Sequence, residues 1–270
     1  FHIYPNFSNA VRTRLRVSSL PSTSVIFHIC GPRAAPTRQM RNAFITIPTV
    51  IDSAYAFQLI SVMDVATGCS QAQSGQATII INPVPTATIT GTIDVCKDSP
   101  EPVVTFTGMN SSTNYVFSYQ KNGGPTQTIN SVLGTNQATL LQSTNVTGLY
   151  EYQLIGVSDG TTLCSSTLNE AIIIDVKPLP IATISPYVEA CHNDTTILEV
   201  TFTGSVGDAP YTFDYTMNGV PSQITSTGNS ITLPIQTSVV GTSTFIITHI
   251  QEGSVLGCQQ TQNVISQATV

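Results

Sequence analysis

Apolar and polar residues alternate along most of this 270-residue chain, and a period of two residues predicts β-strands. Residues 115–119 read Tyr-Val-Phe-Ser-Tyr and residues 211–215 read Tyr-Thr-Phe-Asp-Tyr, so each run places its aromatic rings on one face of a strand. Asn122-Gly123 and Asn218-Gly219 follow these runs closely, and Asn-Gly predicts a tight hairpin turn because both residues tolerate a positive φ. No window keeps a helical apolar period over about ten residues. The pattern therefore predicts an all-β protein.

These motifs belong to a repeat of about 95 residues. Cys96 and Cys191 lie 95 residues apart, and Cys69, Cys164 and Cys258 follow one another at intervals of 95 and 94. Thr-Phe-Thr-Gly, Tyr-x-Phe-x-Tyr and Asn-Gly recur in the same order between these cysteines. Each copy has room for about seven short strands that must bury one face. We therefore expect tandem Ig-like or PKD-like antiparallel β-sandwich modules, the first of them incomplete.

The copies set the expected domain boundaries. We expect residues 85–179 to form the second repeat and residues 180–270 the third, while residues 42–84 correspond to the C-terminal half of the first. Pro-x-Pro stands at both joins, at 83–85 and 178–180, and favours a short extended connector. Both ends of the chain look cut, which predicts a fragment of a longer protein.

Residues 148–152, which read Gly-Leu-Tyr-Glu-Tyr, are similar to the strand that carries a tyrosine corner in such sandwiches. The same residues are also explained as aromatic side chains of the core. In both interpretations they serve the fold rather than a binding site.

The cysteines predict structural disulfides within each complete copy. Each copy has one cysteine near its start and one near its end, so we expect Cys96 to bond Cys164 and Cys191 to bond Cys258. Each bond would close a loop of nearly 70 residues, which adds roughly 4 kcal/mol in the chain-entropy description. Disulfides of this kind indicate an oxidising extracellular environment.

Residues 1–41 break the repeat. All six arginines lie there, without any Asp or Glu, and Phe1 stands where the interval places a cysteine. Cys30 falls at no repeat position, and its spacing of 39 from Cys69 does not favour a bond between the two. We interpret this stretch as an aberrant segment read from a shifted frame of the same repeat, which resequencing of the encoding DNA would test. The alternative is a genuine divergent N-terminal segment.

Charge and motifs exclude several classes of function. Residues 42–270 carry three lysines and all fifteen carboxylates, a net charge of 3 − 15 = −12, which argues against nucleic-acid binding. The alternating arginines of residues 12–16 would otherwise suggest a polyanion patch. No apolar stretch of about 18 residues predicts a membrane span. The chain has no Cys-x-x-Cys, Gly-x-Ser-x-Gly or glycine-rich phosphate loop, so we expect no catalytic site and no enzyme activity.

Metal ligands are sparse as well. His192 follows Cys191 directly, but adjacent residues of a strand point to opposite faces. Asp98 and Asp194 follow the first cysteine of their copies, where calcium would need several converging oxygens. Two or three scattered carboxylates at each junction favour solvated loop charges over calcium, so we expect no bound cofactor. Calorimetric titration with Ca²⁺ would test this expectation.

The motifs together resemble a known family of repeats. Residues 85–89 (Pro-Thr-Ala-Thr-Ile) and 180–184 (Pro-Ile-Ala-Thr-Ile) are each followed within seven residues by a cysteine. With Thr-Phe-Thr-Gly and Tyr-x-Phe-x-Tyr, they make residues 43–270 similar to the tandem Ig-like/PKD-like repeats of large cell-surface proteins of Bacteroidetes, including SprB-type gliding-motility adhesins. The resemblance implies a secreted surface protein exported by a type IX route, and it transfers no catalytic residue.

The expected function is therefore structural and adhesive. The repeats would act as a stalk, or would themselves attach weakly and repeatedly to surfaces or polysaccharide, with neighbouring repeats of the same chain as further partners. The alternative is a set of accessory or carbohydrate-binding modules of a secreted hydrolase whose catalytic domain lies outside this fragment. The chain has no Trp for a carbohydrate platform, which weakens this alternative.

Overall fold

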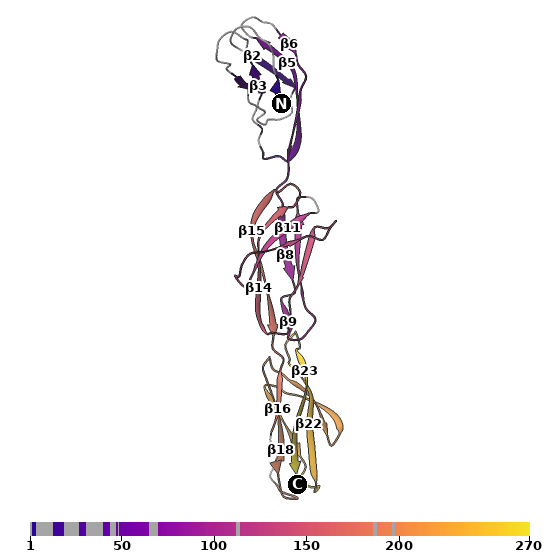
Figure 1. Ribbon diagram of the computed structural model, residues 1–270. Helices are drawn as coiled ribbons and strands as arrows, with labels where there is room; N and C mark the ends of the chain where they lie inside the picture. The colour runs from indigo at the N-terminus through magenta and orange to yellow at the C-terminus, as the bar shows by residue number, and fades with distance from the viewer. Residues whose placement is uncertain are drawn as a thin grey trace. The chain divides into compact units, whose positions relative to one another are not determined.

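The structure is a computed structural model, and it describes residues 2–3, 13–18, 27–30, 40–43, 47, 49–64, 70–111, 114–185, 188–195 and 198–270. These ranges contain strands and turns and no helix, so none of them includes a helix long and apolar enough to cross a membrane. The predicted all-β, Ig-like fold is confirmed (Figure 1).

Eight strands form the second sandwich. One sheet has the order β13-β10-β8 and the other the order β12-β11-β14-β15-β9. The short strand β9 has crossed to the second sheet, where it runs parallel to the end of β15. The strands are β8 (Thr86–Gly91), β9 (Asp94–Cys96), β10 (Val103–Met109), β11 (Tyr115–Lys121), β12 (Gln127–Asn130), β13 (Gln137–Leu141), β14 (Gly148–Asp159) and β15 (Ser165–Lys177).

The third sandwich repeats this arrangement strand for strand. Its sheets have the orders β16-β18-β21 and β17-β23-β22-β19-β20, and the short strand β17 again runs parallel to the last strand, β23. The equal order shows that the sequence repeat is a structural repeat. The strands are β16 (Ile181–Ile184), β17 (Val188–Glu189), β18 (Leu198–Ser205), β19 (Thr212–Met217), β20 (Val220–Thr225), β21 (Ser230–Ile235), β22 (Thr242–Gln251) and β23 (Gln259–Thr269).

The N-terminal strands form two further sheets. Strands β1, β3 and β4 make one, and β2, β5 and β6 make the other, with β7 also paired to β5. Tyr55 and Phe57 of β5 are buried together with Ile47. The strands are β1 (His2–Ile3), β2 (Thr13–Ser18), β3 (Phe27–Cys30), β4 (Met40–Ala43), β5 (Ser53–Asp64), β6 (Ser70–Ala72) and β7 (Gln76–Ile81).

Chain contacts divide the protein into two compact units. The first contains Phe1–Pro85 together with the loop segments Asn110–Ser112 and Asp159–Ser166. The second contains the remaining residues from Thr86 to Val270, and therefore most of the second sandwich and all of the third.

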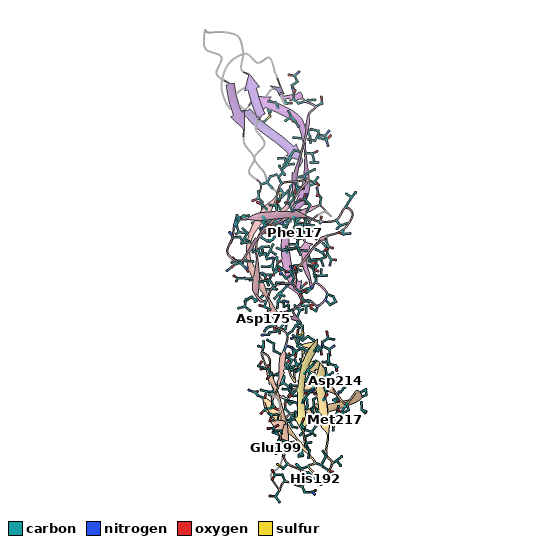
Figure 2. All side chains as sticks on the ribbon, turned by 60° about the horizontal axis from the view of Figure 1, so that its bottom comes forward. Phe117, Asp175, His192, Glu199, Asp214 and Met217 are labelled. Carbon is teal, nitrogen blue, oxygen red and sulfur yellow. A yellow bond between two sulfur atoms is a disulfide. The ribbon has the colours of Figure 1, made fainter. Side chains whose placement is uncertain are left out.

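Alternating aromatic side chains fill the two cores, as the sequence pattern predicts. Phe117 (labelled in Figure 2) is fully buried and packs on Phe106 at 5.7 Å between ring centroids. Phe213 and Phe202 make the same contact in the third sandwich, at 5.8 Å. Such aromatic pairs stabilise a core by about 0.5–1.5 kcal/mol beyond the area they bury.

The tyrosine-corner interpretation of residues 148–152 also fits the structure. The Tyr150 hydroxyl donates a hydrogen bond of 2.9 Å to the carbonyl oxygen of Val146, four residues upstream. Tyr152, two residues further, is buried in the core, where its hydroxyl donates to Gln142 Oε1 at 2.8 Å. One tyrosine therefore fixes the corner and the next serves the core.

Two sequence motifs have clear structural reasons. A Cβ atom on Gly108 would lie 2.5 Å from the Tyr115 ring, and one on Gly204 would lie 2.3 Å from the Tyr211 ring, so each Thr-Phe-Thr-Gly motif ends where only glycine fits. The Asn-Gly turns at 122–123 and 218–219 have positive φ at both residues, as a type I′ hairpin requires.

Candidate functional site: the disulfide junction

A disulfide joins the second sandwich to the third. Cys96, the last residue of β9, bonds Cys258, which immediately precedes β23, with 5.5 Å between the two Cα atoms. The predicted pairings Cys96–Cys164 and Cys191–Cys258 are therefore wrong. Cys164 is a half-buried free thiol and Cys191 is an exposed one.

Strand geometry explains the error. Cys164 precedes the first residue of β15, whereas Cys96 pairs with Lys177 at its last residue. A strand rises about 3.3 Å per residue, so the 13 residues of β15 hold these two cysteines roughly 40 Å apart. A disulfide needs about 4.4–6.8 Å between Cα atoms. The 11 residues of β23 separate Cys191 from Cys258 in the same way.

The Cys30–Cys69 bond, which the spacing does not favour, lies outside the described residues. Cys69 is not described, and Cys30 is described only as the last residue of β3. The shifted-frame interpretation of residues 1–41 likewise stays a prediction.

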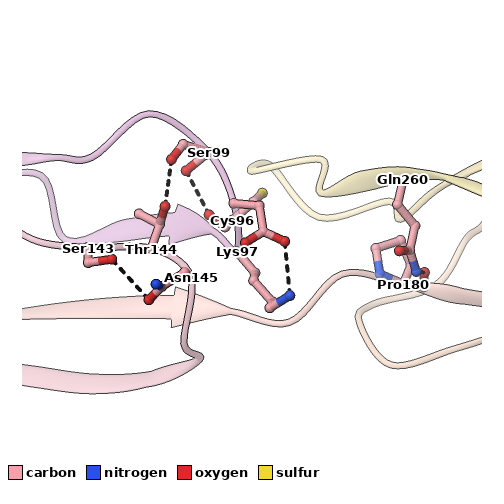
Figure 3. Close-up of polar contacts among 9 residues, drawn as sticks. Cys96, Lys97, Ser99, Ser143, Thr144, Asn145, Pro180 and Gln260 are labelled. Carbon is pink, nitrogen blue, oxygen red and sulfur yellow. Dashed lines mark hydrogen bonds and ion pairs between the residues drawn. The ribbon is translucent and has the colours of Figure 1, made fainter.

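A hydrogen-bonded turn presents Cys96 (Figure 3). The Cys96 carbonyl accepts from the Ser99 amide at 3.2 Å and from the Ser99 hydroxyl at 2.6 Å. The Thr144 hydroxyl donates to the Ser99 carbonyl at 2.6 Å, and the Asp98 amide donates to the Thr144 carbonyl at 3.0 Å. The Lys97 amide donates to the Lys177 carbonyl, which ties the turn to the end of β15. The backbone around Cys96 is therefore fixed by hydrogen bonds within the turn, to Thr144 and to the end of β15.

A buried carboxylate organises the loop that carries Cys258. Glu252 accepts from the Asp208 amide at 2.8 Å, from the Ser254 hydroxyl at 2.6 Å and from the Cys258 amide at 3.2 Å. Burial by itself raises the pKa of Glu252, but these hydrogen bonds and the charge of Lys177 outweigh it and leave the pKa below its ordinary value. Glu252 therefore stays ionised and holds the loop in place.

Sequence reasoning missed this residue, although a signal was present. Asp159 occupies the same place in the second sandwich, where it is buried and accepts from the amides of Thr161 and Thr162 at 2.6 and 2.9 Å. An acid therefore recurs five or six residues before the last cysteine of each copy, at Asp64, Asp159 and Glu252. That recurrence marks a structural carboxylate.

Lys177 concentrates positive charge at the end of β15. The pKa of the Lys177 ammonium group is raised, chiefly by its hydrogen bond to Asp175. The charges of Asp175, Asp94 and Asp208 add to this effect, which outweighs partial desolvation. Asp94 and Asp175 belong to the second sandwich and Asp208 to the third, so the lysine draws acidic groups from both. The Lys177 ammonium group forms an ion pair with Asp175 at 2.5 Å.

Two of the residues considered as metal ligands, His192 and Asp98, make other side-chain contacts. His192 lies with Nε2 at 3.1 Å from the Ser238 carbonyl oxygen, and Asp98 pairs with Lys97 at 2.9 Å. The Asp194 carbonyl accepts from the Thr237 hydroxyl at 2.9 Å. Within the described ranges, no three His, Cys, Asp or Glu side chains are grouped as a metal site.

A cavity of about 690 Å³ lies in the first unit. Its lining includes Asp52, Ser111, Asp159 and Thr162, and none of the lining residues that the structure describes is His, Lys or Cys. The Ser111 hydroxyl donates directly to Asp159, with no imidazole between them to act as a general base. The described lining of this cavity therefore shows no serine–histidine pair.

Comparison with known proteins finds distant likeness in structure alone. No protein-family model matches the sequence, and no curated protein matches it. The I67–I69 I-band fragment of titin is similar over 97% of this chain and 88% of that chain, with 10% identity and a TM-score of 0.45. The ligand-binding domain of human OSCAR is similar over 70% of this chain and 99% of that chain, with 11% identity and a TM-score of 0.30. Function must therefore be argued from this chain's own contacts.

Proposed function

We propose that this chain is a non-catalytic repeat segment of a large secreted cell-surface adhesin, related to the SprB-type proteins that its motifs resemble. Its sandwiches act as a stalk and contact surfaces or polysaccharide weakly and many times. The observation that carries this proposal is the Cys96–Cys258 bond, which joins successive copies of the repeat covalently. Such a bond suits a protein that must persist outside the cell as a connected series of modules.

The placement of aromatic and aliphatic side chains supports weak rather than specific binding. Six of the seven tyrosines that the structure describes are buried in the cores, so they form no flat platform for a sugar ring. Exposed aliphatic side chains lie both on strands and in loops, and the loop residues include Leu133 between β12 and β13 and Val255 between β22 and β23. The six buried tyrosines are Tyr55, Tyr115, Tyr119, Tyr152, Tyr211 and Tyr215.

This placement gives no support to the alternative of carbohydrate-binding modules of a hydrolase. It does support multivalent attachment, because each exposed loop offers a small apolar contact and repetition raises the overall affinity. Linked weak contacts gain about 10²–10⁴ in avidity when their geometry allows simultaneous engagement.

Bead retention under flow tests the adhesive role. Beads that carry many copies of the full chain should stay on glass or agarose at least 100-fold longer than beads that carry single copies. Leu133→Ser combined with Val255→Ser should shorten retention of the dense beads. Equal retention of dense and sparse beads would refute the adhesive role, as would an unchanged retention of the double variant. Antibodies to the third sandwich should also label intact cells that produce the parent protein, and labelling only after lysis would refute the surface location.

A further inference from the structure

The end of the third sandwich repeats the surroundings of the bonded cysteine of the second. The turn at residues 191–194 has the same backbone contacts as the turn at residues 96–99. The Cys191 carbonyl accepts from the Asp194 amide at 3.0 Å, and the Cys96 carbonyl accepts from the Ser99 amide at 3.2 Å. The third residues of the two turns, Asn193 and Asp98, have positive φ values of 59° and 60°. The Asn193 amide donates to the Thr237 carbonyl at 2.9 Å, and the Asp98 amide donates to the Thr144 carbonyl at 3.0 Å. Cys191 therefore occupies the position that Cys96 occupies in the bonded junction.

The neighbouring strands agree with this equivalence. Cys96 ends β9, which runs parallel to the end of β15, and Cys191 follows β17, which runs parallel to the end of β23. His192, labelled in Figure 2, marks this end of the third sandwich. The two cysteines differ in one respect: Cys96 is bonded and the Cys191 thiol is free and exposed.

The other half of the bond also recurs. The Cys258 carbonyl accepts from the Glu252 amide at 3.0 Å, and the Cys164 carbonyl accepts from the Asp159 amide at 2.8 Å. Each cysteine precedes the last strand of its sandwich. Each sandwich of this repeat therefore carries one cysteine beside the end of its last strand and another just before the start of that strand. The bond seen here joins the first kind in the second sandwich, Cys96, to the second kind in the third sandwich, Cys258.

We propose that the end of the third sandwich around Cys191 is a docking surface for a further sandwich of this same repeat. Cys191 forms with it the bond that Cys96 forms with Cys258, and the occupant supplies a cysteine just before its last strand. The two thiols join as Sγ–Sγ and pass two electrons and two protons to a disulfide oxidant such as oxidised glutathione, which is reduced to two thiols. The bond requires no adhesive activity of either sandwich.

A chain extended by one copy tests the proposal directly. The full chain is followed by a second copy of residues 178–270 in which the added Cys191 is replaced by serine, and Cys30→Ser and Cys69→Ser remove thiols outside the described sandwiches. After oxidation with glutathione, peptide mapping should find Cys191 bonded to the added copy's cysteine at the position of Cys258. Alkylation of Cys191 should fall at least tenfold relative to the unextended chain.

Two matched variants sharpen the result. Replacing only the added copy's cysteine by serine should restore full alkylation of Cys191. In the unextended chain, Cys96→Ser frees Cys258, yet Cys191 should stay alkylatable because β23 separates the two thiols. A reactive Cys191 in the extended chain with Cys96–Cys258 intact would overturn the proposal. So would a bond from Cys191 to Cys164, to Cys258 of its own sandwich or to Cys191 of a second chain.

Discussion

Replacing Gly204 with alanine should destabilise the third sandwich through one contact. The new Cβ would lie 2.3 Å from Cγ of Tyr211, far inside van der Waals distance. Neither partner yields easily, because Gly204 sits in β18 and Tyr211 is fully buried. The Tyr211 hydroxyl also donates to the Gly207 carbonyl at 2.7 Å, so the ring is fixed at both ends.

The expected cost follows from this crowding. Adding a methyl group to a well-packed core destabilises a protein by about 1–3 kcal/mol. Gly228 offers a matched control in the same sandwich, because its Cβ would meet no atom within 4 Å and its φ is not positive. Gly228→Ala should change the free energy of unfolding by less than about 0.5 kcal/mol.

Hydrogen exchange read by mass spectrometry measures the effect within the full chain. Amides of β18 and β19 that exchange through global opening should exchange about 5- to 150-fold faster in Gly204→Ala, which corresponds to 1–3 kcal/mol. Strands β10 and β11 of the second sandwich serve as an internal reference. Gly204→Ala should cost little in a Tyr211→Val background, because the clashing ring is then gone.

Three results would refute this reasoning. Equal exchange in Gly204→Ala and Gly228→Ala would show that the ring contact does not limit the core. An equal cost of Gly204→Ala with and without the Tyr211 ring would show the same. Faster exchange confined to β10 and β11 would place the effect in the wrong sandwich.

Two further predictions concern the junction. Cys258→Ser opens a covalent loop that spans a sequence separation of 162, and the chain-entropy description assigns such a loop about 5 kcal/mol. Both sandwiches should therefore unfold at lower denaturant concentration than in the parent. An unchanged denaturation midpoint, measured by circular dichroism, would contradict this prediction. Glu252→Gln should cost about 1–3 kcal/mol, because an amide cannot accept all three hydrogen bonds of the carboxylate. The lowered pKa of Glu252 means that its contribution is present above the ordinary carboxyl pKa of about 4.3 and is lost as the pH falls below it. The free energy of unfolding of Glu252→Gln should therefore fall less steeply at acid pH than that of the parent. An equally steep fall would refute the assignment.

Local patterns predicted the sandwiches well because they report local physics. The alternation at residues 115–119 places all three aromatic rings in the core, and Asn122-Gly123 forms its turn with positive φ at both residues. The glycine of each Thr-Phe-Thr-Gly motif was recognised only as part of the repeat. Glycine is needed there because a tyrosine ring, that of Tyr115 or Tyr211, packs against it from the other sheet. No local sequence pattern contains this packing.

The disulfides were mispredicted because sequence spacing does not tell which end of a strand a cysteine occupies. Cys96 and Cys164 belong to one copy, yet the length of β15 lies between them. The crossing of β9 to the second sheet places Cys96 at the far end of its sandwich, and the pairing with Cys258 follows from that single placement. The ionised Glu252 beside Cys258 was detectable from its recurrence, but its role required the three hydrogen-bond donors around it.

The bond between the sandwiches also decides how the protein carries mechanical load. Tension entering at Thr86 would pass along β8 and β9 to Cys96, cross the sulfur–sulfur bond to Cys258 and leave through β23. The intervening chain lies off this path, so a contour of roughly 550 Å for a separation of 162 residues cannot be drawn out while the bond is intact. The residues between the two cysteines, which include Phe117 and Phe213, are thereby kept from being extended, and a reductant rather than force controls whether this part of the chain can lengthen.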